Sequence, residues 1–432
     1  MKKIAHSLLA ISICTMMSSV SFAEDAFDLN GSTMTGDWGG TRTELADKGV
    51  KFDGTIAMDS SYLADGGYDA HQSPTFATQF GLGTTLDMTK LAGWSGVTIR
   101  ALVTARQGES TSLRGIQAPD APQWANSQAN WGRGNSGSRL SELYIDKKFD
   151  SGWDVRLGRM GLGTEFNTMA CDFQGNAFCA AQMGKWQGKL WYNTPVSQWG
   201  GRVKYQFNPE LFAQVGVFEY NPENALERQG WNLDTDHADG VNILSEVVWS
   251  PKQGLNNLPG SYRFGTLYNT ADDAKNQYDI AHKAGTKGED RSYGGWIAFE
   301  QQLTSTGEGK RGLHSFGNFT LHDRTTTAVN DSQQLGLKYY GLLEGRSNDI
   351  LGLAVNRVHL NDRYVSYVNN NRLGTNSRQL NEDAEYNIEL NYSYYPIKWF
   401  MLRPLIQYVV HPGVTNQVDN AFVVGLGSKV IF

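Results

Sequence analysis

Residues 421–432 read Ala-Phe-Val-Val-Gly-Leu-Gly-Ser-Lys-Val-Ile-Phe, and this stretch decides the fold. Because successive side chains of a strand point to opposite faces, its large apolar residues share one face: Phe422, Val424, Leu426, Val430 and Phe432. The other face holds two glycines and Lys429. A transmembrane barrel needs such an end, because its last strand must pair with its first and leave no open edge in lipid. The stretch therefore predicts a β-barrel of the Gram-negative outer membrane.

The N-terminus has the three parts of a secretory signal peptide. Lys2 and Lys3 are positively charged, residues 4–20 are mostly apolar or small, and Ser21-Phe22-Ala23 has the small-x-small pattern of a cleavage site. We therefore expect residues 1–23 to be removed. The alternative, an N-terminal membrane anchor, is disfavoured because the apolar stretch is shorter than the roughly 20 residues that a helix needs to span a bilayer.

Composition and charge exclude several classes of protein. The full chain has a net charge of −6, and removal of two lysines with the signal peptide leaves 36 basic and 44 acidic residues, a charge of −8. Such an acidic chain is not expected to bind nucleic acid. No other segment has the length and apolarity of a transmembrane helix, which excludes a helical membrane protein. The 48 glycines and 12% aromatic residues permit a barrel, in which only alternate residues face lipid.

Two cysteines remain in the exported chain, because Cys14 leaves with the signal peptide. In an oxidising compartment, Cys171 and Cys179 are expected to form a disulfide that closes a short loop. The two thiols have no neighbouring histidines in the sequence, so a metal site is not expected.

Segments of alternating apolar and polar residues recur through the chain. Residues 97–106, 211–218 and 386–394 each alternate with period two, so that one face suits lipid and the other suits a water-filled lumen. A soluble β-sandwich would also alternate. Its strands would be shorter on average, however, and its apolar face would pack a core.

The connections between these segments set the number of strands. A first count gives seventeen candidate strands, whereas bacterial barrels have an even number. Short turns alternate with long loops only if residues 185–193 belong to a long loop near residues 161–195, which leaves seven turns and eight loops. We therefore predict an all-β protein, a transmembrane barrel of sixteen antiparallel strands whose long extracellular loops fold into the lumen.

A short segment precedes the barrel. Residues 41–48 predict a short helix that Gly49 ends, and we assign residues 24–48 to a periplasmic N-terminal segment. Residues 49–432 then form the barrel. An energy-coupled transporter is excluded, because the lumen of such a transporter is plugged and this segment is too short to form a plug domain.

Short motifs run through nearly the whole mature chain: TGDWGGTR at 35–42, LGR at 157–159, EFN at 165–167, CDF at 171–173, WYN at 191–193, RVKY at 202–205, and Glu389, Asn391-Tyr392, Arg403-Pro404, Gln407-Tyr408 and Pro412-Gly413 before the final strand. Together they resemble the carbohydrate-selective porins of the OprB type. The resemblance implies a sixteen-stranded outer-membrane channel through which monosaccharides such as glucose diffuse passively and without a cofactor. It also implies that Phe432 is the terminal aromatic by which the barrel-assembly machinery selects the chain.

A channel for sugars needs hydrogen-bond donors and acceptors that release their ligand quickly. Arginines and carboxylates that face each other across a narrow lumen supply both. Alternation places these candidates on lumen faces: Arg100, Arg106, Glu142, Arg202, Lys204 and, on a later strand, Glu300. Arg159 lies at a break in the alternation, so its strand has a bulge or has already ended there, and either puts it near the base of the long loop. The alternative is that any water-filled lumen is lined with charge.

We place the constriction in the long loop that carries the two cysteines. Long structured loops are usually functional, and a disulfide restricts their freedom. Trp191, and after it Trp186, are the candidates for stacking on a sugar, with Asn193, Lys185 and Lys189 as donors. The alternative is that both tryptophans only pack the loop against the wall.

The leading interpretation is a porin that selects monosaccharides, and a general or an anion- or dicarboxylate-selective porin is the alternative. Interleaved acidic and basic candidates disfavour an anion channel, which uses rings of arginine and lysine. An enzyme is not expected, because the most enzyme-like pair, His314 and His322, has no Ser/His/acid grouping beside it. The expected partners are monosaccharides, outer-membrane lipid and lipopolysaccharide, and the barrel-assembly machinery. The sequence leaves monomer and homotrimer open.

Overall fold

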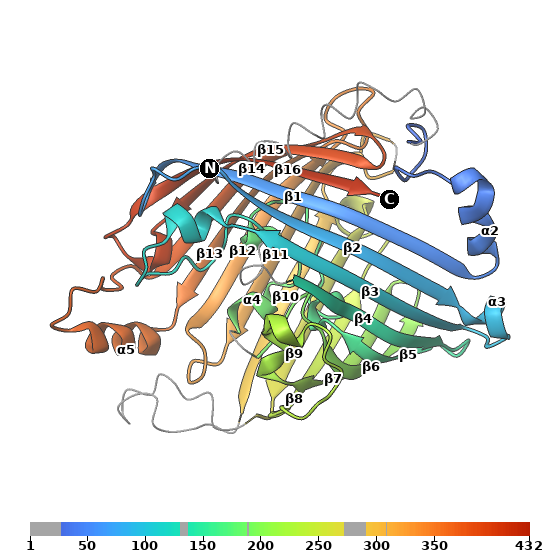
Figure 1. Cartoon of the computed structure of the whole chain (residues 1–432), viewed down its shortest axis with the longest axis horizontal. Helices are drawn as coiled ribbons and strands as arrows, with labels where there is room; N and C mark the ends of the chain where they lie inside the picture. The colour runs from blue at the N-terminus through green and yellow to red at the C-terminus, as the bar shows by residue number, and fades with distance from the viewer. Residues whose placement is uncertain (1–26, 130–136, 188–189, 272–290, 308) are drawn as a thin grey trace, which may run out of the picture.

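The computed structural model describes residues 27–129, 137–187, 190–271, 291–307 and 309–432. The expected signal peptide and its cleavage site lie outside these residues. Across the described ranges, sixteen antiparallel strands close into one barrel, and each pairs with its neighbours in sequence (Figure 1). The predicted fold and strand number are confirmed.

The strands are β1 (Val50–Gly67), β2 (Thr75–Asp87), β3 (Val97–Gly108), β4 (Gly137–Lys148), β5 (Trp153–Met160), β6 (Gln198–Asn208), β7 (Leu211–Tyr220), β8 (Gly240–Trp249), β9 (Gly260–Asn269), β10 (Ser292–Gln302), β11 (Gly312–His322), β12 (Val329–Tyr340), β13 (Ile350–Leu360), β14 (Ala384–Ile397), β15 (Phe400–Val410) and β16 (Asp419–Ile431). The α-helices are α2 (Thr41–Asp47), α3 (Met88–Ala92), α4 (Met183–Trp186) and α5 (Asp362–Arg372). Shorter helical turns are η2 (Trp38–Gly40), η3 (Ser112–Ile116), η4 (Leu162–Thr164), η5 (Asn176–Phe178), η6 (Pro222–Ala225), η7 (Glu227–Gln229), η8 (Leu255–Asn257) and η10 (Pro412–Val414). No described helix has the length and apolar character needed to cross a membrane.

The final strand closes the barrel as its sequence predicts. β16 pairs with β1 from Asp419 to Ile431. Arg42 of α2 donates hydrogen bonds to the carbonyl oxygens of Phe52 in β1 and of Phe432 after β16, both at 3.0 Å. The predicted N-terminal helix is therefore present, and it links the two strands that meet at the seam.

Alternation divides the strands into an outward and an inward face. Outward side chains are large, apolar and exposed, as for Leu82, Leu157 and Phe264 at 52%, 55% and 59%. Inward side chains include charged residues such as Arg100 and Glu389. A soluble sandwich would bury its apolar face, so that alternative is wrong and the outward face suits lipid.

The two ends of the barrel differ. α2 and α3 lie at one end, and α5 lies at the other (Figure 1). Both α3 and α5 lie in connections between successive strands. Asp87 and Asn361 cap these two helices by accepting hydrogen bonds from the N–H groups of Thr89 and Arg363. Their apolar periodicity is too brief to reveal a helix, but the caps are a signal that the sequence carries.

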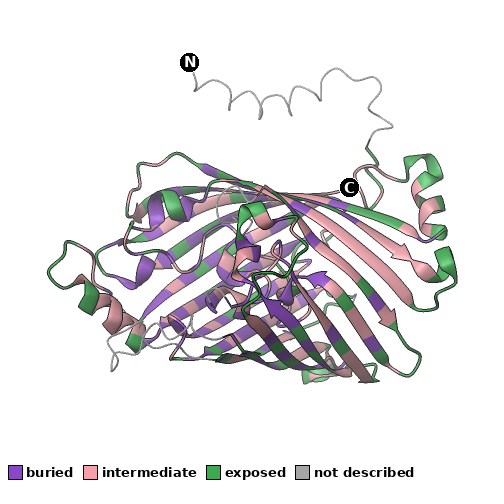
Figure 2. Cartoon of the chain, turned by 60° about the horizontal axis from the view of Figure 1, so that its bottom comes forward, coloured by how far each residue is buried: buried purple, intermediate pink, exposed green. Residues whose placement is uncertain are grey.

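Loops fill part of the barrel interior. Buried residues gather there and on the strand faces next to the loops (Figure 2). One cluster packs loop residues Phe173 and Phe178 against Phe316 of β11. A second packs loop residue Trp191 against Trp296 of β10. The predicted folding of a long loop into the lumen is confirmed.

Candidate functional site

Residues 161–187 and 190–197, in the connection from β5 to β6, cross the lumen and reach the opposite wall, and the candidate donor Lys189 lies outside the described residues. We call them the crossing loop. The backbone N–H groups of Gln174 and Gly175 donate to Glu389 of β14 at 2.9 and 2.6 Å. Because β14 is far from β5 around the barrel, the crossing loop divides the lumen instead of lining one edge of it.

Buried carboxylates on the wall hold the loops in place. Glu246 of β8 accepts a hydrogen bond from the N–H of Asn167 in the crossing loop at 2.9 Å. Glu385 of β14 accepts from the N–H groups of Trp124 and Ala125, in the loop between β3 and β4, at 3.0 Å each. Like Glu389, both glutamates are at most 2% exposed. Hydrogen bonds to a carboxylate are short and strong, so these glutamates position loops and do not face the pore.

The predicted disulfide is present. It joins Cys171 to Cys179, whose Cα atoms are 4.2 Å apart. The enclosed residues Phe173 and Phe178 have ring centroids 5.4 Å apart, and Phe173 also packs on Phe316 at 5.6 Å. The disulfide therefore closes a segment that has an aromatic core on the far wall.

Inward charges on β1 and β3–β6 form two neighbouring groups of ion pairs, which we call together the charge ladder. The first group is Asp53, Arg100 and Glu142. The second is Asp146, Asp154, Arg156, Arg202 and Lys204, with Glu165 of the crossing loop. Arg100 Nε lies 3.2 Å from Glu142, and Arg202 Nε lies 3.0 Å from Glu165. Lys204 Nζ completes the second group at 3.0 Å from Asp154. Of the candidate residues, the structure pairs Arg100 with Glu142 and brings Arg202 and Lys204 to the same carboxylate, Asp154.

Members of the charge ladder differ in their access to the lumen. The side chains of Arg100, Glu142 and Lys204 are 15%, 13% and 25% exposed. The side chain of Arg202 is 2% exposed and lies within 3.5 Å of three carboxylates. The first three can therefore bond a passing solute, whereas Arg202 holds its neighbours.

Trp191 and Trp186 lie within packed clusters and not on the pore surface. They are 1% and 3% exposed. The Trp191 ring meets Trp296 edge-on at 5.8 Å, and it packs so closely on Gly184 that a Cβ there would clash with it. Neither ring has a face free for a sugar. Both tryptophans therefore pack the loop against the wall, as the alternative interpretation states.

Asn193 and Arg159 also make structural contacts. Asn193 accepts from Trp191 Nε1 at 2.8 Å and donates to the carbonyl of Ala181 at 2.9 Å. The expected bulge or strand end at Arg159 is wrong, because β5 runs through it without a register shift. Arg159 is 1% exposed and donates to Ser197 Oγ at 2.9 Å. A charged residue is tolerated at this break in the alternation because it is covered and hydrogen-bonded.

An outer cavity of about 260 Å³ lies between the crossing loop and the loop ends of β3 and β4. Its charged lining residues are Arg106, Arg139, Lys185 and Glu227, and asparagines together with apolar side chains such as those of Tyr192 and Val196 line the rest. Burial, together with repulsion from Arg106, lowers the pKa of Lys185 to about 7. The sequence predicted that Arg106 faces the lumen, whereas Arg139 was not among the predicted residues. An extra residue, Ser141, shifts the register of β4 against β3 and changes which of its residues face inward.

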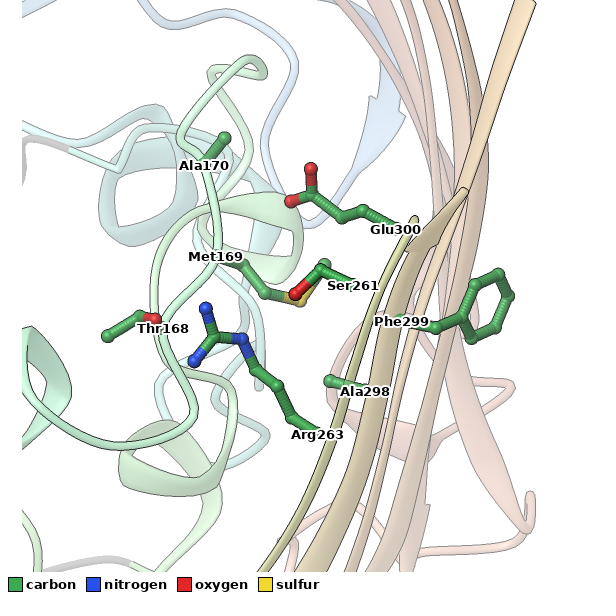
Figure 3. A pocket seen from close by; sticks show the side chains of 8 residues that line it. All are labelled: Thr168, Met169, Ala170, Ser261, Arg263, Ala298, Phe299 and Glu300. Carbon is green, nitrogen blue, oxygen red and sulfur yellow. The ribbon is translucent and has the colours of Figure 1, made fainter. Parts of the chain in front are cut away.

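An inner cavity of about 210 Å³ lies between residues 168–170 of the crossing loop and strands β9 and β10. Arg263 and Glu300 point into it from the wall toward Met169 and Ala170 of the loop, whereas Phe299 points away (Figure 3). Alternation alone placed Glu300 on a lumen face. The same rule, applied to the strand that contains Arg263, could have found this arginine.

The two histidines of β11 bond to neighbouring protein groups. His322 Nδ1 lies 2.9 Å from Gln187 in the crossing loop, and its Nε2 lies 2.9 Å from Thr320. His314 Nε2 lies 2.8 Å from the carbonyl of Lys310. In the part of the chain that the structure covers, no three potential metal ligands come together.

A closed sixteen-stranded barrel with an apolar outer face and a loop across a polar lumen defines a porin of the outer membrane. The family model described as "Carbohydrate-selective porin, OprB family" matches residues 71–432. The chain belongs to the OprB family of carbohydrate-selective porins.

Individual relatives agree with this assignment. Porin B of Pseudomonas aeruginosa is 39% identical over 432 aligned residues, which cover 96% of this chain and 95% of that protein. The putative porin QuiX of Acinetobacter baylyi is 36% identical, with 98% of each chain covered. The high-pH structure of Pseudomonas putida OprB matches with a TM-score of 0.89 at 39% identity, and covers 94% of this chain and 100% of that one.

Proposed function

We propose that this porin lets monosaccharides such as glucose diffuse passively across the outer membrane. The observation that carries the proposal is the crossing loop, held against the far wall by Glu389. It leaves a cavity of about 260 Å³ on one side and of about 210 Å³ on the other. Cavities of this size favour single sugars over longer chains, and membership of the family supports carbohydrate as the solute.

The charge ladder supplies both kinds of hydrogen-bonding group that a sugar requires. Arg100 donates and Glu142 accepts, and both side chains are partly exposed. A sugar hydroxyl that leaves water can bond to either group, which offsets the loss of its hydration. Because each charge already has a partner, such bonds are weak enough for release. Matched charges in the ladder also favour a neutral sugar there over an anion.

Orientation follows from the two ends of the barrel. We place the end with α2 in the periplasm and the end with α5 outside the cell, because short turns face the periplasm in such barrels and longer loops face outward. A cysteine introduced at the exposed residue Thr375 should then react with an impermeant maleimide in intact cells. Protection of this cysteine in intact cells, with reaction only after lysis, would reverse the orientation.

Proteoliposome swelling with glucose, maltose and raffinose tests the proposed selectivity. Wild-type protein should pass glucose faster than maltose by more than the difference in their free diffusion. Arg100→Gln should reduce this preference, and Arg324→Gln should not, because Arg324 is 55% exposed in the connection after β11. Equal size-corrected rates for all three sugars would identify a general porin. A current in planar bilayers that phosphate blocks and glucose does not would identify an anion porin.

A further inference from the structure

The outer cavity differs from the charge ladder in how its cations are balanced. Each arginine of the ladder has a carboxylate oxygen within 3.2 Å. The ion pairs formed among the described residues include none with Arg106, Arg139 or Lys185, the three cations of the outer cavity. Glu227 acts on Arg139 and Asp59 acts on Arg106 without forming a close ion pair. The lining of the cavity still contains more cations than carboxylates.

Arg106 has a nitrogen available for a ligand. Its Nε donates to Gln79 Oε1 at 2.6 Å, and its Nη2 donates to the carbonyl of Thr194 at 3.3 Å. Nη1 meets no acceptor within the described ranges. Since Arg106 lines the cavity, Nη1 can reach a group bound inside it.

Lys185 contributes charge and no free donor. Its ammonium group bonds to the carbonyl oxygens of Asn176 and Cys179, and to Asn176 Oδ1 at 2.9 Å. These bonds use its three hydrogens. They hold the ammonium at the edge of the cavity, where it raises the local potential.

Arg139 and Glu227 complete the charged lining. Arg139 donates to the carbonyl oxygens of Asn224 and Leu226 at 2.8 and 2.7 Å, so its position is determined by the neighbouring loop. Glu227 is the only carboxylate among the described residues that line the cavity. Two arginines and Lys185, which is partly charged at neutral pH, thus face one carboxylate. In the inner cavity, by contrast, one arginine faces one glutamate.

A neutral sugar gains little from a net positive cavity, whereas a carboxylate gains from both its charge and its two acceptor oxygens. We propose that the outer cavity binds monosaccharides that carry a carboxylate, such as hexuronates and aldonates. The carboxylate contacts Arg106 Nη1, and the hydroxyls bond to Asn126 and Asn176 in the same lining. The inference rests on the proposed function, because it extends the sugar pathway to acidic sugars.

Uptake of labelled glucuronate and labelled glucose into proteoliposomes tests the inference. Wild-type protein should take up glucuronate at least as fast as glucose at equal concentration. Arg106→Gln should lower the ratio of glucuronate to glucose uptake by about tenfold or more, the loss expected for one charge-assisted bond. Arg106→Lys should keep much of the ratio. Arg324→Gln, which removes the same charge outside the lumen, should keep all of it.

The outcomes separate the two proposals. Wild-type uptake of glucose without glucuronate would overturn the inference and leave the proposed function standing, and this measurement needs no variant to fold. Equal losses of both solutes in Arg106→Gln would also overturn it, because they would make Arg106 a general part of the pore wall. Uptake of neither solute would refute the proposed function itself.

Discussion

On β3 and β4, Arg100 and Glu142 face the lumen with side chains that are 15% and 13% exposed. On β14, Glu385 and Glu389 also point inward from the wall, but loops cover them and both are 0% exposed. The first pair offers polar atoms to solutes, and the second pair bonds the backbone of two loops. Charge on an inward face therefore has two uses in this barrel, and what covers the side chain decides between them.

The largest effect on stability and conductance should come from replacing a buried glutamate that holds a loop. Glu389→Ala removes the acceptor for Gln174, Gly175 and Gln407 and leaves buried donors without a partner. We expect the free energy of unfolding to fall by about 3 kcal/mol or more, and the crossing loop to leave the far wall. Heat-modifiable migration in gels and single-channel conductance measure the two effects. Glu344→Gln, at an exposed position, is the control, and an unchanged conductance in Glu389→Ala would contradict the role given to Glu389.

The disulfide should matter less than this glutamate. The double variant Cys171→Ser, Cys179→Ser frees a short segment, which costs about 2–3 kcal/mol of local order by chain entropy. Phe173 and Glu389 still hold the segment on the wall. We therefore expect a noisier single-channel current with the mean conductance largely kept. A conductance as high as that of Glu389→Ala would show that the disulfide is the main restraint.

At the partly exposed residue Arg100, a substitution should change selectivity and leave stability nearly unchanged. Arg100→Gln breaks ion pairs that are open to the lumen, so the free energy of unfolding should change by less than about 1 kcal/mol. The preference for glucose over maltose should fall by about threefold, as for one lost hydrogen bond. Swelling assays and thermal unfolding of the same preparation test this. A large loss of stability would place Arg100 with the loop-holding residues.

The smallest effect should be a pH dependence at the outer cavity. The pKa of Lys185 is lowered to about 7 by burial and by Arg106, so raising the pH from 6 to 8 removes most of its charge. The ratio of glucuronate to glucose uptake should then fall, by less than in Arg106→Gln. The folded-state pKa of Lys185 lies below the unfolded value of about 10.4. The free energy of unfolding should therefore rise as the pH rises from the folded-state pKa toward the unfolded value. Lys185→Met should abolish the pH dependence of the ratio, and a ratio that still falls in this variant would assign the titration to another group.

Some site residues were predictable and others were not. Alternation was enough to predict that Arg100, Glu142 and Lys204 face the lumen, because side chains on one face of a strand recur every two residues. It failed at Arg139, where the register of β4 shifts. It also could not tell that Trp191 is buried, since the partner ring of Trp296 lies more than a hundred residues away in the chain.

The sequence by itself determined the barrel, its sixteen strands, the two faces of each strand, the disulfide and the family, because all of these follow from local period, spacing and short motifs. Only the tertiary structure decided which inward charges meet the solute. The crossing loop covers Glu246 and Glu389 and leaves Arg100 and Glu142 open. Its path depends on hydrogen bonds between segments far apart in the chain, and no local pattern records them.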